Sequence, residues 1–163
     1  MFYFRFLGDI LNNVIWHDLD LLIIDMPPGT SDIHITIAQE YEVDGAIIVT
    51  TPQLVSSIDA LKSGRMLQNE NIDTKILGVV ENMSYFQTEK LKDEKFYIFG
   101  KDGGKELAKL LNTDLLGQIP IVEEICYAGD AGNPLISIES PIVKDSYLQI
   151  ANQIIEKLKL NLS

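Results

Sequence analysis

The sequence is poor in cysteine, with Cys126 as the only one among 163 residues. One thiol cannot form a disulfide within the chain, and it cannot build a zinc or iron–sulfur site without further ligands. A chain without cysteine pairs fits a reducing compartment, so we predict a cytoplasmic protein. We expect Cys126 to be a small, buried apolar residue.

Basic residues are also scarce, with 13 lysines and arginines against 24 aspartates and glutamates and a net charge of -11. Nucleic acids and anionic lipid surfaces are bound mainly through lysine and arginine, so we predict neither as a partner. No run approaches the roughly 20 apolar residues of a membrane span. The opening MFYFRFLGDI lacks the charged start and cleavage site of a signal peptide, and we interpret it as a helix.

What the sequence does contain is apolar chain in short runs. Four of them are rich in β-branched residues and apolar throughout, which predicts buried parallel strands at 20–25, 45–51, 75–83 and 114–120. Helical patterns cover 31–40, 54–69, 103–112 and 141–158, and 84–102 is expected to be a loop or lid. This alternation predicts one α/β domain over 1–163, a three-layer fold with a mostly parallel sheet and flanking helices.

The last predicted helix has an apolar face that includes Val143, Tyr147, Ile150 and Ile154. We interpret this face as packing on the core. The alternative is a helix lying on a membrane surface, which would need a basic polar side.

Polar residues and turn formers follow each predicted strand. They are Asp25, Pro27, Pro28 and Gly29 after the first, Thr50, Thr51, Pro52 and Gln53 after the second, Glu81 and Asn82 after the third, and Pro120 after the fourth. Ligands of parallel sheets bind beyond the carboxyl ends of the strands. A carboxylate such as Asp25 can hold Mg²⁺ through water there, and a glycine lets a backbone N–H approach a phosphate. Alternatively, Asp25 caps the next turn and Asn82 is an ordinary strand-end amide.

Five motifs in this order, LDLLIIDMPPGTSD, IIVTTPQ, GVVENMSYF, IFGKDGG and LLGQIP, resemble the Mrp/NBP35 group of P-loop ATPases. The resemblance runs from about residue 5 to residue 157. These ATPases are of the MinD/ParA-like class and carry iron–sulfur clusters to client proteins. The resemblance implies a P-loop NTPase fold, binding of ATP and Mg²⁺, and a homodimer that forms around nucleotide.

The resemblance also implies roles for particular residues. Asp25 would be the Walker B carboxylate that holds Mg²⁺ through water and supports catalysis. Pro27, Pro28, Gly29 and Thr30 would form the switch that responds to the γ-phosphate. Asn82 would hydrogen-bond the adenine ring, and the loop at Pro120 and Ile121 would close over it. Gln53 would lie near the partner subunit.

Two motifs of that family are absent from this sequence. There is no glycine-rich phosphate loop, since GKDGGKE at 100–106 lacks the G-x-x-x-x-G-K spacing and the Ser/Thr that binds Mg²⁺. Thr88 and Leu91 stand where the family has the C-x-x-C that shares an iron–sulfur cluster between subunits. We therefore assign no iron–sulfur ligand, and we expect the chain to match the carboxyl-terminal part of such an ATPase, incomplete at its N-terminus.

The main hypothesis from the sequence is an ATP-binding protein of the Mrp/NBP35 type with a role in iron–sulfur cluster assembly or transfer. Without the phosphate loop it should hydrolyse ATP weakly or not at all. A missing central strand should leave exposed sheet edges, which favours self-association. The alternative is a non-catalytic, dimerising or regulatory binding protein of the MinD/ParA type, and an inert gene fragment is a third interpretation.

Overall fold

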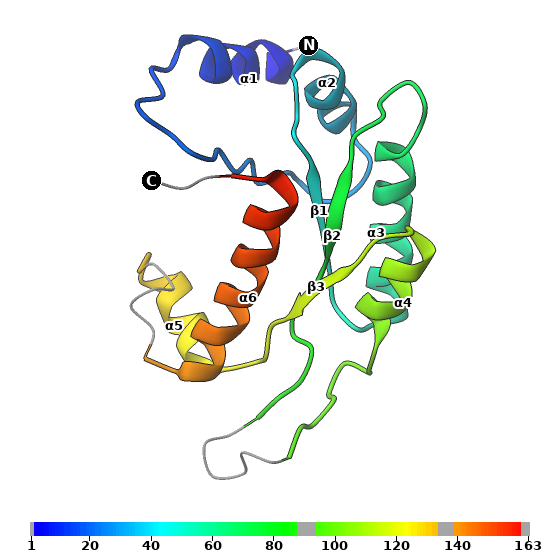
Figure 1. Cartoon of the computed structure of the whole chain (residues 1–163), viewed down its shortest axis with the longest axis vertical. Coiled ribbons are helices and arrows are strands. Elements are labelled where there is room, and N and C mark those ends of the chain that lie inside the picture. Colours follow the sequence, from blue (N-terminus) through cyan, green and yellow to red (C-terminus); the bar gives the residue numbers. More distant parts are fainter. Residues whose placement is uncertain (1, 88–93, 134–138, 161–163) are drawn as a thin grey trace.

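The computed structural model describes residues 2–87, 94–133 and 139–160 (Figure 1). This part of the chain contains three strands and six helices. Their order is α1 (Phe2–Asn13), α2 (Asp32–Glu40), β1 (Ala46–Thr50), α3 (Leu54–Leu67), β2 (Ile76–Glu81), α4 (Gly103–Leu110), β3 (Leu115–Gln118), α5 (Glu123–Asp130) and α6 (Pro141–Leu158). From α2 to α5 the helices and strands alternate.

The strands form one parallel sheet in the order β1-β2-β3. Ile48 lies opposite Val79, and Val80 lies opposite Gly117. The continuous apolar runs at 45–51, 75–83 and 114–120 become these strands because helices cover both faces of the sheet. Figure 1 shows α3 and α4 on one side of the sheet and α6 on the other.

Two apolar clusters form the core, one on each face of the sheet. The strand residues divide between them by alternation, since neighbouring side chains of a strand point to opposite faces. On the face covered by α3 and α4, the buried residues of the cluster are Ile48 and Val79 from the strands and Leu107, Ala108 and Leu111 from α4 and its C-terminal end. Under α6 they are Val80, Leu116, Ile119 and Ile150.

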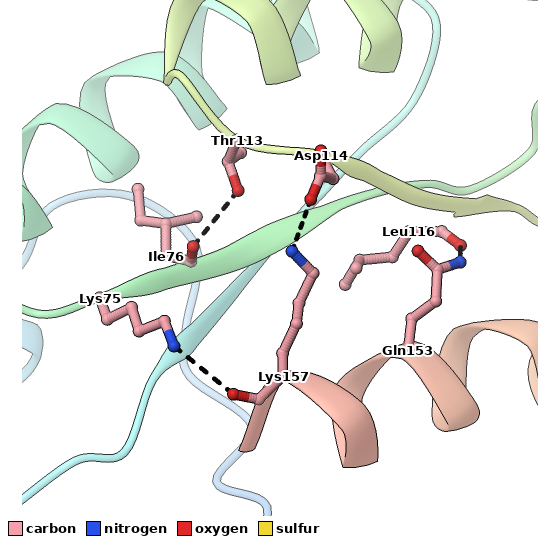
Figure 2. Close-up of polar contacts among 7 residues, drawn as sticks. All are labelled: Lys75, Ile76, Thr113, Asp114, Leu116, Gln153 and Lys157. Carbon is pink, nitrogen blue, oxygen red and sulfur yellow. Dashed lines mark hydrogen bonds and ion pairs between the residues drawn. The ribbon is translucent and has the colours of Figure 1, made fainter. Parts of the chain in front are cut away.

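Helix α6 is tied to the sheet by polar contacts as well (Figure 2). The Gln153 amide donates to the Leu116 carbonyl at 2.6 Å, and the Lys157 ammonium lies 2.6 Å from the Asp114 carboxylate. Val143 and Ile150 are buried. The prediction that this helix packs on the core is therefore confirmed.

The segment 20–25 is not a strand, so this prediction from the sequence was wrong. The chain between α1 and α2 has no regular structure here, and Leu21, Leu22, Ile23 and Ile24 are exposed. A strand is stabilised by hydrogen bonds to a neighbour, and this segment has none in the described part of the chain. Apolar composition alone does not supply that neighbour.

One further helix and one corrected residue complete the comparison. Helix α5 covers residues for which the sequence analysis made no prediction. Cys126 lies on it and is exposed, with its thiol 3.8 Å from the Asp130 carboxylate, because the buried position of this short helix is taken by Ala128. Thr88 and Leu91 lie outside the described residues.

Within the described residues, no helix has the length and apolar character needed to cross a lipid bilayer.

Candidate functional site

The chain continues to pair beyond the carboxyl ends of the strands, and this pairing brings Asn82 close to the loop after β3. The Asn82 N–H donates to the Thr50 carbonyl at 2.7 Å. One step further along, the Ser84 N–H donates to the Ile119 carbonyl at 2.9 Å, and the Ile121 N–H donates to the Tyr85 carbonyl at 2.7 Å. Segments 82–86 and 119–121 therefore form one edge beyond the sheet, as expected for parallel strands.

A buried carboxylate holds this edge together. Glu81, the last residue of β2, is fully buried and accepts hydrogen bonds from the Ser84 hydroxyl, the Gly104 N–H at 2.6 Å and the Gln118 amide at 2.7 Å. None of the ion pairs in the described part of the chain involves Glu81. A buried charge must be compensated, and here three donors from three different segments compensate it.

Two glycines let the start of α4 approach the same edge closely. A Cβ atom on Gly103 would lie 2.3 Å from the Pro52 carbonyl oxygen, and one on Gly104 would lie 2.7 Å from the Cβ atom of Glu81. The backbone of α4 thus packs directly on the ends of β1 and β2. Side chains at these two positions would push the helix away from the strands.

The Asn82 amide is half-buried, and its Oδ1 accepts the N–H of Met83 at 2.9 Å. Met83 has a φ of 54°, a left-handed conformation that turns the chain sharply after β2. Among the described residues, no protein partner is found for Asn82 Nδ2, so this group can donate to a ligand. Pro120 is buried and Ile121 is half-buried beside it.

The turn with Asp25 lies elsewhere. Its residues Asp25, Pro27, Pro28, Gly29 and Thr30 are all exposed. The Ser63 hydroxyl donates to the Gly29 carbonyl at 3.3 Å. Because α3 starts at the carboxyl edge of the sheet with Leu54, Ser63 lies about 13 Å further along the helix, toward the opposite edge. The structure therefore does not bring this turn to Asn82 and Pro120.

The described residues contain no group of three or more His, Cys, Asp or Glu side chains arranged to hold a metal ion. A hollow of about 430 Å³ does occur, lined by 38–44 and 72–74. It lies before β1 and β2, at the amino edge of the sheet, and thus away from Asn82. We assign it no role in the site.

Gln53 precedes α3 on the carboxyl edge and is exposed. Three apolar side chains on the first turns of α3, Leu54, Val55 and Ile58, are exposed beside it. Together these residues form an apolar surface next to the edge that carries Asn82.

Sequence reasoning missed the role of Glu81. It placed Glu81 among the strand-end residues that could face a ligand, whereas the structure turns this carboxylate inward. A signal was present in the sequence, because an acid that ends an otherwise apolar strand, with Ser84 and a Gly103–Gly104 pair downstream, is an unusual arrangement.

Residues 3–155 match the ParA family model, which describes the NUBPL iron-transfer P-loop NTPases. This chain belongs to that family. Among its relatives, the iron–sulfur cluster transfer protein NUBPL of Mus musculus is 40% identical over 151 residues. That match covers 92% of this chain and 46% of the mouse protein. The iron–sulfur cluster carrier protein of Saccharolobus solfataricus is 44% identical over 160 residues, covering 96% and 51% respectively.

Solved structures support the same fold. The nucleotide-binding protein of Archaeoglobus fulgidus, in complex with ADP, superposes with a TM-score of 0.70 at 35% identity, covering 80% of this chain and 53% of that one. The cell division ATPase MinD of Pyrococcus furiosus has a TM-score of 0.50 at 23% identity and shares the fold. The resemblance and the P-loop NTPase-like α/β fold predicted from the sequence are confirmed. The chain spans about half the length of the curated relatives it matches.

Proposed function

We propose that this chain, as a single domain over residues 1–163, supplies the adenine-binding part of an ATP-binding protein that acts in iron–sulfur cluster assembly or transfer. The observation that supports this most directly is the edge formed by Asn82 with Pro120 and Ile121. The related protein from Archaeoglobus fulgidus was solved with ADP, which points to the same class of ligand.

The chemistry of this edge suits an adenine ring. An asparagine amide offers one donor and one acceptor, which match the N6 amino group and a neighbouring ring nitrogen of adenine. Within the described residues Asn82 Nδ2 has no acceptor, so it is available to a ligand, and Oδ1 can accept a second hydrogen bond besides that of Met83. The half-buried side chain of Ile121 would cover the face of the ring, on a loop in which Pro120 is buried.

The residues proposed to bind the phosphates lie apart from Asn82 in this structure. We propose Asp25 as the Mg²⁺ ligand, through water, and Pro27, Pro28, Gly29 and Thr30 as the turn that senses the γ-phosphate. A site with one carboxylate fits Mg²⁺ only when phosphate oxygens and water complete its coordination. Since this turn lies against α3 here, binding would require it to move toward the strand ends. With no glycine-rich loop in the sequence, we expect ATP hydrolysis by this chain to be weak or absent.

The proposed partners follow from the family and from one surface. Gln53 and the exposed Leu54, Val55 and Ile58 would face a second subunit in a homodimer. Iron–sulfur client proteins in the cytoplasm are the proposed recipients, with any cluster as cargo bound through thiolates other than this chain's own. The second candidate function, a non-catalytic dimerising or regulatory protein of the MinD/ParA type, draws on the same apolar surface and on the missing phosphate loop.

Adenosine and guanosine titrations followed by ¹H–¹⁵N NMR test base binding without the phosphates. We expect adenosine to shift the amide signals of Asn82, Met83 and Ile121, with a dissociation constant above about 1 mM, equivalent to less than about 4 kcal/mol of binding. Asn82→Asp should abolish these shifts, and Asn152→Asp on the exposed side of α6 should leave them unchanged. Equal shifts with guanosine, or shifts that survive Asn82→Asp, would contradict the proposal.

A further inference from the structure

The buried carboxylate of Glu81 joins the two segments that carry the proposed adenine-binding residues. The Ser84 hydroxyl and the Gln118 amide both donate to the same carboxylate oxygen, Oε1. Ser84 follows Asn82 by two residues in the chain. Gln118 is the last residue of β3 and directly precedes the loop 119–121. One oxygen atom therefore connects the turn after β2 to the loop after β3.

The turn that contains Asn82 depends on such support. Met83 has a φ of 54°, a left-handed conformation that is unfavourable for a residue with a side chain. The hydrogen bond between Ser84 and Glu81 closes around Asn82 and Met83. In this turn the Met83 N–H donates to Asn82 Oδ1 at 2.9 Å. The conformation at Met83 therefore decides which atom of the Asn82 amide bonds to the protein, and it leaves Nδ2 available to a ligand.

The second carboxylate oxygen of Glu81 fixes the position of the group itself. Oε2 accepts the Gly104 N–H at 2.6 Å, at the start of α4. Both oxygens of the carboxylate are thus used, so it cannot turn without losing a bond to one of three segments. A glutamine at this position has only one acceptor oxygen, so it cannot accept from donors on both sides.

We propose that Glu81 is a positioning residue of the adenine site, whose carboxylate holds the Asn82 amide and the loop 119–121 in the geometry that binds the base. Glu81 does not touch the base itself, because protein atoms cover it completely. The inference rests on the proposed adenine binding and goes beyond the contribution of Glu81 to stability.

Adenosine titrations followed by ¹H–¹⁵N NMR test this role in Glu81→Gln, with Leu111→Ala as a destabilised control. Leu111 is buried at the end of α4, about 12 Å along the helix from Gly103. Leu111→Ala leaves a cavity in the core but removes no hydrogen bond of Glu81. We expect the dissociation constant for adenosine to rise about fivefold or more in Glu81→Gln, because the edge must then become ordered on binding, and to stay within about twofold in Leu111→Ala. A similar rise in both variants would mean a general loss of stability and would overturn the inference.

The same two variants can be compared without ligand. The ¹H–¹⁵N heteronuclear NOE reports fast backbone motion at each N–H. We expect it to fall at Met83, Ser84 and Ile121 in Glu81→Gln and to be unchanged at these residues in Leu111→Ala. Unchanged values in Glu81→Gln would show that the carboxylate does not order the edge, and the inference would be wrong.

Gln118→Met tests the same network with Glu81 in place, and it decides the question if Glu81→Gln does not fold. Methionine keeps the length of the side chain and removes the donor to Glu81. The matched control is Gln153→Met, which removes the amide that donates to the Leu116 carbonyl from α6. We expect the dissociation constant for adenosine to rise about threefold in Gln118→Met and to stay within about twofold in Gln153→Met.

Two further outcomes separate this inference from the proposed function. Absence of adenosine binding to the unsubstituted protein would overturn the proposed function and, with it, the role of Glu81 in binding. Binding with the same dissociation constant to the unsubstituted protein, Glu81→Gln and Gln118→Met would leave the proposed function intact and overturn this inference alone.

Discussion

Glu81 is a carboxylate in the core, and within the described residues no ion pair involves it. Its three hydrogen bonds join β2, α4, β3 and the turn after β2. We expect Glu81→Gln to lower the free energy of unfolding by about 2 kcal/mol. The glutamine amide can still accept hydrogen bonds on its oxygen, but it lacks the charge that strengthens each bond. Its NH₂ group would also face the three groups that now donate to Glu81. Urea denaturation at neutral pH measures this loss.

Glu70→Gln is the matched control for Glu81→Gln, since Glu70 is exposed after α3. It should change the unfolding free energy by less than about 0.5 kcal/mol. Similar effects of the two substitutions would show that the Glu81 network contributes little to stability.

Tyr147 on α6 should make the free energy of unfolding depend on pH in the alkaline range. Burial raises the pKa of its phenol above the usual value of 10.0. The folded protein therefore holds this proton more tightly than the unfolded chain, so the contribution to stability is complete below pH 10 and is lost as the pH rises through the folded pKa. We expect the unfolding free energy of the unsubstituted protein to fall more steeply between pH 9 and pH 11 than that of Tyr147→Phe. Parallel declines in the two proteins would rule this contribution out.

At the scale of elements, continuous apolar runs were enough to predict three of the strands, and apolar periodicity predicted α2, α3, α4 and α6. The same reasoning failed at 20–25, because a run such as LLII carries no information about whether a neighbour exists to pair with it. It also missed α5, whose eight residues EEICYAGD include a glycine and too few turns to show a period.

The candidate site was predictable to the same extent as its strands. Asn82, Pro120 and Ile121 follow paired strands, so the parallel sheet itself brings them to one edge. Asp25 follows the segment that did not become a strand, and its position therefore could not be inferred from sequence. The inward direction of Glu81 depended on the approach of α4, a tertiary contact that no local pattern encodes.

Replacing a glycine by alanine should destabilise the protein in helix α4 and stabilise it in helix α5. A Cβ atom on Gly104 would lie 2.7 Å from Glu81 Cβ in the core, so Gly104→Ala should destabilise the protein by about 1–3 kcal/mol. Nothing lies within 4 Å of the corresponding atom on Gly129 in α5, so Gly129→Ala should stabilise by up to about 1 kcal/mol. Thermal unfolding followed by circular dichroism compares the two. Destabilisation of equal size by both would mean that the approach of α4 to β2 is not the cause.

At the scale of the whole molecule, the two outer strands of the sheet differ in how far they are covered. Helix α6 covers β3 and makes polar contacts with it and with the residue before it (Figure 2), whereas β1 pairs on one side only within the described residues. The chain also spans about half the length of its curated relatives. Among the proposed site residues, Asn82, Pro120 and Ile121 lie together at one edge, whereas the turn with Asp25 lies away from them.

The excess of acidic charge should also lower the stability of the molecule as a whole. With a net charge of -11, repulsion between like charges opposes the compact state, and dissolved salt screens it. We expect the melting temperature at neutral pH to rise by roughly 2–4 °C when sodium chloride is raised from about 20 mM to about 300 mM, which corresponds to about 1 kcal/mol. The three ion pairs of the described residues are mostly exposed, so screening them should cost less than this gain. The control is the same salt step near the isoelectric point of 4.5, where the net repulsion disappears and the rise should disappear with it. A melting temperature that falls with salt at neutral pH would show that local ion pairs outweigh the repulsion.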